Sequence, residues 1–488
     1  MVQRRSLGLR MSAELPLATK QRIAYAFRAF CAIYGYDSMV ECESTPCSTD
    51  ARICYGVTPS SAQDLSIPAV YAFRPANVPA PPPVHVALKP TPMYTKLGLS
   101  SLPCFFASAD TTDIDWLGEV FEWLSCADEY AVTQRDEIGR IPFSATVHGR
   151  FGLDASIPYA GLAMYELNRC IRNSIGSTWP ERAISPGGGD SILIAPSHDL
   201  DYLPINPVGD VKRLLKNMAI AAVHFRDPSL FISILGSVAR AIVTRKSPLD
   251  WVEAMVRCET DAGLRSTYNV ISRNGHVRDA NYELEHSKVK RMLRLLVEQN
   301  MEIALHGSYT SLEGHTLGLE LEHLVAQGCQ VSGVRQHWLR FAGDNLFEEV
   351  AALGISYDST VGYADRIGFR AGACFPYLPY DFRRERPYPF VEIPLVIMDV
   401  ALYEQARREH VSARMLCERA LDMIESFGWG GIAILWHNTA FGGCQMPANI
   451  GELYWELKRK RHTWVGCHEV AQLVAPLLRC GKDETLVC

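Results

Sequence analysis

Acidic, imidazole and guanidinium side chains follow several apolar segments in the second half of the chain. The segment SILIAPSHD ends at Asp199, and Asp201 stands two residues further on. Two carboxylates this close, directly after an apolar strand, repel each other unless a cation, a proton or solvent relieves the repulsion. A metal ion would do so. The alternative is that both acids cap the turn that follows.

Two further segments end in imidazoles. EIALHGSY carries His306, and QVSGVRQHW carries Arg335 and His337. One carboxylate and two imidazoles leave a coordination position for water, which is the arrangement of hydrolytic Zn²⁺ sites. We therefore predict that Asp201, His306 and His337 bind a divalent metal, and these ligand types favour zinc. GIAILWHN places His437 in the same series, where an imidazole can protonate a leaving group.

Seven short apolar or β-branched segments recur beyond residue 190, and segments with helical periodicity separate them. The strand candidates are SILIAPSHD, RSTYNVISR, EIALHGSY, QVSGVRQHW, GISYDST, FVEIPLVIMD and GIAILWHN. Such alternation predicts a parallel sheet of βα units, either an incomplete barrel or an open doubly wound sheet. In both folds the reactive groups gather at the carboxyl ends of the strands.

The length of 488 residues predicts two domains. The glycine-rich stretch SPGGGD at 185–190 is the strongest flexible punctuation, so we place the boundary there. Residues 1–185 are predicted to form a smaller α/β module that includes a helix over 16–36. Residues 186–488 are predicted to form the domain that carries the reactive groups.

Composition excludes several classes of protein. A hydrophobic fraction of 48% and a charged fraction of 21% are those of a globular protein. The net charge of −6 gives no basic footprint for nucleic acids or anionic membranes, so neither is an expected partner. No apolar run is long enough to span a bilayer, the nearest being FISILGSVARAIV. Fifteen scattered cysteines and the absence of a signal-peptide pattern favour a cytoplasmic protein.

Residues 190–440 resemble the NodB-type polysaccharide deacetylases, in a variant whose first motif reads H-D-x-D. The resemblance implies a deformed (β/α)7 barrel. It also implies that Asp199 is the general base, Asp201 and His306 bind the metal, Arg335 holds the base, and His437 in Leu435-Trp436-His437 is the general acid. The module before residue 186 resembles, through FEWLSCADEY and RDEIGR, an uncharacterised module that precedes deacetylase domains in some surface-polysaccharide clusters.

The chain departs from the family pattern at one position. The family has a second metal-binding His four residues after the first, and Thr310 stands there. Three interpretations follow: His337 replaces it, the metal is held weakly, or the metal is absent. His315 is a weaker substitute, because its surroundings are those of a loop.

Further polar and aromatic residues at strand ends are candidates for substrate binding, namely Asp358, Arg370, Tyr309 and Trp338. We expect a metal-dependent hydrolase that removes an N-acyl group from an amino sugar or glycan precursor. One alternative is a carbohydrate-binding protein that kept the barrel and lost the metal. Another is a hydrolase of a different non-peptide C–N bond. Serine-hydrolase, zincin and nucleotide-binding motifs are missing from the sequence.

Overall fold

The structure is a computed structural model that describes residues 5–479 apart from several short gaps. The gaps are 42–48, 71–77, 108–112, 177–178, 182, 186–190, 225, 245–246, 248, 342 and 460–461. Most of the predicted boundary stretch, 185–190, therefore lies outside the described residues. No helix among the described residues is long and apolar enough to cross a membrane.

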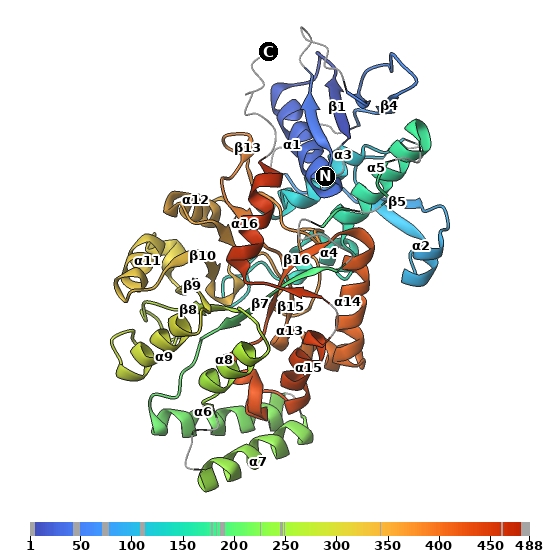
Figure 1. Cartoon of the computed structure of the whole chain (residues 1–488). Coiled ribbons are helices and arrows are strands. Elements are labelled where there is room, and N and C mark those ends of the chain that lie inside the picture. Colours follow the sequence, from blue (N-terminus) through green and yellow to red (C-terminus); the bar gives the residue numbers. More distant parts are fainter. Residues whose placement is uncertain are drawn as a thin grey trace.

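The second half of the chain builds one parallel sheet of nine strands, in the order β14-β11-β10-β9-β8-β7-β16-β15, with β17 beside β7 (Figure 1). The strands are β7 (Leu193–Asp199), β8 (Thr267–Val270), β9 (Glu302–Gly307), β10 (Val331–Gln336), β11 (Tyr357–Asp358), β14 (Val391–Glu392), β15 (Leu395–Met398), β16 (Gly430–Leu435) and β17 (Thr463–Trp464). Each of the seven predicted segments overlaps at least one of them. β17 was not predicted.

The sheet curls until its two outer strands approach each other. β14 and β15 lie at opposite ends of the strand order, yet β14 ends at Glu392 and β15 begins at Leu395. Three residues of extended chain reach at most about 11 Å, so the two edges must be close. Between them, Pro394 accepts a hydrogen bond from the backbone N–H of Ala433. The sheet is consistent with a barrel, as predicted, and not with an open sheet whose edges are far apart.

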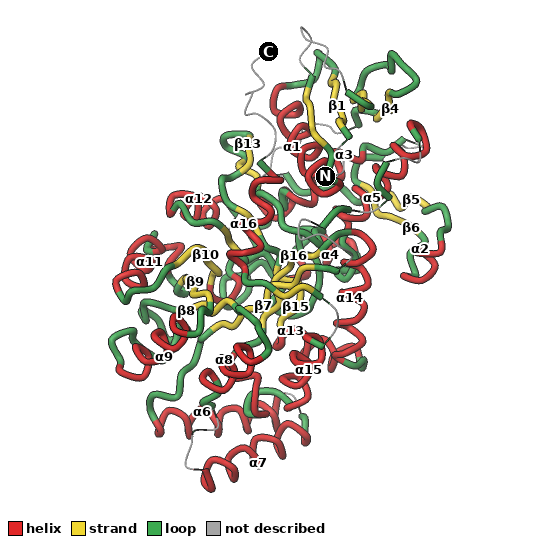
Figure 2. The backbone as a smooth tube through the Cα atoms, in the orientation of Figure 1, coloured by secondary structure: helices red, strands yellow, loops and turns green. Residues whose placement is uncertain are grey.

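Helices surround the curled sheet, and α6 and α7 lie beyond one end of it (Figure 2). They are α6 (Pro207–Ala219), α7 (Pro228–Thr244), α8 (Val252–Asp261), α9 (Ser287–Glu298), α10 (Ser311–Gly314), α11 (Leu317–Ala326), α12 (Asp344–Leu353), α13 (Asp399–Glu409), α14 (Ala413–Phe427), α15 (Ala448–Lys458) and α16 (Cys467–Leu478). Two 3₁₀ turns, η4 (His337–Leu339) and η5 (Asn438–Gly443), directly follow the segments of β10 and β16. A π-helical turn, η3 (Ile220–His224), links α6 to the segment before α7, and β12 (Tyr380–Asp381) and β13 (Arg386–Pro387) form a hairpin.

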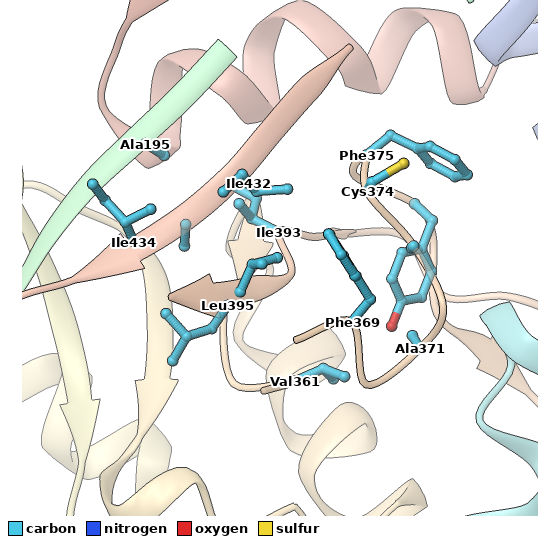
Figure 3. Close-up of a cluster of buried hydrophobic side chains, with 14 of the residues drawn as sticks. Ala195, Val361, Phe369, Ala371, Cys374, Phe375, Ile393, Leu395, Ile432 and Ile434 are labelled. Atoms are coloured by element: carbon cyan, nitrogen blue, oxygen red, sulfur yellow. The ribbon is translucent and has the colours of Figure 1, made fainter. Parts of the chain in front are cut away.

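Apolar side chains fill the space beside the strands. Figure 3 shows Ala195, Ile432, Ile434 and Leu395 from β7, β16 and β15 directed toward one another and toward the loop that carries Phe369. All are at most 2% exposed. Burial on this scale is the main stabilising contribution to folding, and it fixes the strand ends that carry the polar groups.

The first half of the chain forms a parallel four-stranded sheet, β2-β1-β3-β4, with α1, α3 and α5. Its elements are β1 (Ser6–Met11), α1 (Leu17–Tyr34), β2 (Asp37–Val40), β3 (Ala51–Tyr55), β4 (Asp64–Ile67), β5 (Val84–Ala87), α2 (Pro92–Leu97), β6 (Ser101–Cys104), α3 (Trp116–Leu124), η1 (Ala127–Ala131), η2 (Phe143–Ala145), α4 (Val147–Phe151) and α5 (Tyr159–Ile175). The helix predicted over 16–36 is α1, which ends at Gly35 in the left-handed conformation that glycine favours.

The two halves share one apolar core. Buried polar contacts also cross between them: Tyr25 donates to the carbonyl of Leu378 at 2.6 Å, and Ala160 N–H donates to the carbonyl of Gly372 at 2.9 Å. The division at residue 186 stays a prediction, because the described residues on both sides of it pack as one body.

A buried ion pair also joins the two halves. Arg370 donates to both carboxylate oxygens of Glu129, with Nη2 at 2.6 Å from Oε2, and a further guanidinium N–H donates to the carbonyl of Gly362. Both side chains are 5% exposed. The contact explains why Arg370, predicted to bind substrate, lies away from the cavity described below.

Replacing Arg370 by Ala is expected to lower the free energy of unfolding by about 3–5 kcal/mol, because Glu129 would stay buried without its cation. Urea denaturation followed by circular dichroism measures the change. Arg419→Ala is the matched control, since its pair with Asp154 is about half exposed and should contribute little. Equal stability of the two variants would contradict a structural role for Arg370.

Candidate metal centre and active site

Five strand ends place their side chains around one point. Asp199 is the last residue of β7, and His306 is the next-to-last residue of β9. His337 directly follows β10. His437 follows β16 by two residues, and Asp399 follows β15. The parallel arrangement brings these carboxyl ends to one edge of the sheet, as predicted from the alternation of strands and helices.

Asp201, His306 and His337 converge. Their ligand atoms all lie within 4.8 Å of one another. His306 Nε2 is 3.3 Å from Asp201 Oδ1, and His337 Nε2 is 3.5 Å from the same oxygen. Asp201 Oδ1 is buried and accepts no hydrogen bond from the described residues. An oxygen in this position, facing two imidazole nitrogens, is the donor set of a zinc site.

Each imidazole has an oxygen atom facing its other nitrogen, and for His306 the contact is a hydrogen bond. His306 Nδ1 lies 2.8 Å from the carbonyl oxygen of Arg335, so Nε2 is the atom that faces Asp201. His337 Nδ1 lies 3.7 Å from Asp279 Oδ1. Asp279 is itself fixed by the backbone N–H groups of Tyr309 and His276. A hydrogen bond such as that of His306 fixes the ring orientation of a metal-binding histidine. Asp279 places a negative charge beside His337 without a hydrogen bond.

Charge at the centre favours a cation. Burial alone would raise the pKa of Asp201, but His337 and His306 hold it well below its usual value. Burial alone would also lower the pKa of His337, but Asp201 and Asp279 raise it to about 9. The field that attracts a proton to this imidazole also attracts a metal ion, and the two compete for the same nitrogen.

Asp199 is held at one oxygen. Its Oδ1 accepts hydrogen bonds from Arg335 Nη1 at 2.9 Å and from Asn269 Nδ2 at 2.7 Å. Its Oδ2 lies 3.5 Å from His306 Nε2. Burial would raise the pKa of this carboxyl, but the Arg335 guanidinium, with His306 and His437, keeps it below its usual value. An ionised carboxylate with one oxygen fixed and the other beside the metal ligands can accept a proton there.

His437 faces Asp199 and Asp201 from the other side of the centre. Its backbone N–H donates to Asp399 Oδ2 at 2.7 Å, and its Nδ1 lies 2.8 Å from Asp399 Oδ1. Its Nε2 lies 3.5 Å from Asp201 Oδ2. Burial would lower the pKa of His437, but Asp399 outweighs that effect and raises it to about 10. The imidazole therefore holds a proton near neutral pH.

A cavity of about 560 Å³ opens over these groups. Trp338 lines it, is 38% exposed and donates through Nε1 to the carbonyl of Arg278, so it offers a flat face beside the centre. The first half of the chain also contributes Ile138 and Arg140 to the lining. The module before residue 186 therefore forms part of the wall of the site.

The other predicted substrate-binding residues lie elsewhere. Tyr309 is outside the cavity lining, where its hydroxyl accepts from Arg278 Nη1 at 2.6 Å. Asp358 is fully buried, and its carboxylate accepts hydrogen bonds from both the backbone N–H and the hydroxyl of Thr360. His315, the weaker substitute ligand, has a side chain that is 73% exposed and lies 2.6 Å from Glu349.

Sequence reasoning missed three contributors. Asp399 is the last residue of the predicted strand segment FVEIPLVIMD, but the sequence does not indicate its pairing with His437. Asn269 on β8 and Asp279 in the loop after it were not singled out at all. The strand-end rule could have found Asn269, which stands next to last in its strand.

No protein-family model and no curated protein matches the chain. Among solved structures it is similar to a candidate polysaccharide deacetylase from Mycobacterium smegmatis, with 17% identity and a TM-score of 0.36 over 59% of this chain and 91% of that one. It is also similar to the allantoinase Puue, with 14% identity and a TM-score of 0.37 over 61% and 94% of the two chains. The function proposed next rests on the side chains of the site.

Proposed function

We propose that the chain is a metal-dependent hydrolase that removes an N-acyl group, acetyl in the simplest case, from an amino sugar of a glycan or glycan precursor. The observation that carries the proposal is the convergence of Asp201, His306 and His337 beside Asp199 and His437. The order of motifs shared with the NodB-type deacetylases supports it. In the same proposal the curled sheet is a deformed (β/α)7 barrel, with β14 and β15 as one strand interrupted at Pro394 and β17 as an addition.

In the proposed amide hydrolysis each group of the site has one role. A divalent metal on Asp201, His306 and His337, zinc by its donor set, would supply a Lewis acid that polarises the acyl carbonyl. Asp199 takes a proton from the attacking water, whose oxygen bonds to the acyl carbon. Arg335 keeps the carboxylate ionised and in place. His437 donates its proton to the nitrogen as the C–N bond breaks, because an amine leaves poorly unless protonated. The products are a carboxylic acid and a free amine.

His337 supports this function over a binding protein without metal. That alternative depended on Thr310, which stands where the family has a second histidine. His337 follows β10, the neighbour of the strand that carries His306, and its Nε2 faces Asp201 Oδ1. The ligand set therefore has three members without a ligand at position 310. Hydrolysis of another C–N bond, such as that of a formyl amide, would use the same groups. Release of carboxylic acid from N-acetylated and N-formylated amino sugars by the zinc-loaded protein tests the proposal and separates these substrates.

Replacing Asp399 by Asn is expected to move the alkaline limb of the kcat/KM profile to lower pH by about one to three units. The general acid must be protonated, so activity is lost as pH rises through its pKa, and Asp399 is what raises that pKa in His437. Rate measurements between pH 6 and about pH 10 give the profile. Asp365→Asn, a surface carboxyl paired with Arg366, is the control. An unmoved limb in the Asp399 variant would remove His437 from the role of acid.

A further inference from the structure

Helices α6 and α7 expose an unusual amount of apolar surface. They lie side by side at the end of the molecule far from the N-terminal sheet (Figure 1). Of the 19 large hydrophobic side chains exposed among the described residues, eight fall between positions 208 and 243. They are Val208, Val211, Leu215, Val223, Ile232, Leu235, Ile242 and Val243, which are 45–83% exposed. A patch of this kind marks an interaction site.

The exposed residues follow helical spacing. On α6, Val208, Val211 and Leu215 stand three and four residues apart, which puts them on one face. On α7, Ile232, Leu235 and Ile242 stand three and seven residues apart, which also puts them on one face. The opposite face of α7 is occupied, since Ser233 and Ser237 donate to the carbonyls of Gly443 and Gly442 in η5. The apolar stripes are therefore the outer surfaces of helices that are anchored on their inner side.

The charge of this segment differs from that of the whole chain. Lys212, Lys216, Arg226 and Arg240 are exposed between positions 207 and 244, whereas the only two acids there, Asp210 and Asp227, are not. Asp210 is buried, and Asp227 caps α7 through the N–H groups of Ser229 and Leu230. The exposed charges of this segment are therefore all positive, on a chain of net charge −6.

We propose that α6 and α7 dock this protein on an anionic lipid bilayer. Apolar stripes flanked by lysine and arginine are the pattern of helices that lie in the bilayer interface, where the stripes enter the acyl region and the cations meet the headgroups. A second copy of the same surface would bring like charges together, which disfavours self-association through it. The overall net charge pointed away from such a partner, and the local distribution reverses that expectation for this segment.

Docking would place the site beside the membrane. Arg213 and Asn217, on the face of α6 opposite its apolar stripe, line the active-site cavity together with Ile220 of η3. One helix would therefore form a wall of the cavity and contact the lipid. If the proposed function holds, the substrate is an amino sugar carried on a lipid, reached without leaving the bilayer surface.

Sedimentation with vesicles tests the docking without metal or substrate, so its outcome does not depend on the hydrolase activity. The full chain should sediment with vesicles of equal phosphatidylcholine and phosphatidylglycerol, and much less with phosphatidylcholine alone. Leu215→Ser/Ile242→Ser/Val243→Ser should bind about tenfold more weakly. The control is Val297→Ser/Leu319→Ser/Met415→Ser, whose residues are 50–58% exposed on α9, α11 and α14, and it should bind like wild type.

Thermal unfolding followed by circular dichroism checks that both triple variants are folded. Equal sedimentation of the two triple variants would overturn the proposal, as would absence of wild-type binding to the anionic vesicles. Light scattering measures the oligomeric state and so tests whether a second copy of the chain binds this surface instead. A wild-type dimer that becomes a monomer in the Leu215→Ser/Ile242→Ser/Val243→Ser variant would assign the surface to a second copy and not to lipid. Acyl release from a soluble amino sugar, measured without vesicles, reports separately on the proposed function.

Discussion

Replacing Asp199 by Asn is expected to lower kcat by about 10²–10⁴-fold while the protein keeps its metal. The reason is geometric. The Oδ1 of an asparagine can still accept from Arg335 and Asn269, as the carboxylate does at 2.9 and 2.7 Å, so the local structure is retained. The second oxygen becomes an amide nitrogen, which has no lone pair to accept the proton of water. Acid release and metal content, measured on one preparation, check both halves of the prediction.

A matched control separates loss of the base from a general effect of removing a buried carboxylate. Asp381 is also buried and paired with an arginine, with Oδ2 at 2.8 Å from Arg384, but it lies in the β12–β13 hairpin and not in the cavity lining. Asp381→Asn should turn over like wild type. Wild-type turnover in the Asp199 variant would remove Asp199 from the role of base.

Replacing His337 by Ala is expected to abolish turnover through loss of the metal. The variant leaves Asp201 and His306 with one ligand fewer, and metal affinity should fall by more than about a hundredfold, since even indirect contacts to a ligand contribute that much. His315→Ala is the control, because it removes an exposed imidazole that lies beside Glu349. Turnover is measured at saturating and at limiting zinc. Full activity of the His337 variant at limiting zinc would show that the metal is held elsewhere.

Most of the centre could be predicted because strand ends are visible in the sequence. Apolar runs that stop at Asp199, His306, His337 and His437 identify both the strands and the edge where parallel strands meet. The convergence of His337 on Asp201 follows from β10 lying beside β9, with Arg335 opposite His306 in the register. Hydrophobic periodicity alone does not distinguish an open sheet from a closed one. The closure is visible only in the structure, at Pro394 and the short link between β14 and β15.

The contacts that could not be predicted join residues far apart in the chain. Glu129 pairs with Arg370 across 241 positions, and no local pattern connects them. Asp279 supports His337 from a loop without a strand or helix signal. Asp358 shows a different limit: it stands at a strand end as predicted, but its carboxylate accepts hydrogen bonds from Thr360 and does not line the cavity. A position near a strand end is therefore not sufficient for a place in the site, and loop and helix residues such as Asp279 and Arg213 also contribute to it.

The central claim is that Asp201, His306 and His337 bind one metal ion, and elemental analysis tests it most directly. Purified protein, first stripped with a chelator and then reconstituted, is analysed together with His306→Ala, His337→Ala and His315→Ala. We expect about one equivalent of Zn²⁺ or a similar divalent ion in wild type and in the His315 variant, and loss of that ion in the other two. A wild-type protein that binds no metal after reconstitution, or His306 and His337 variants that retain a full equivalent, would contradict it.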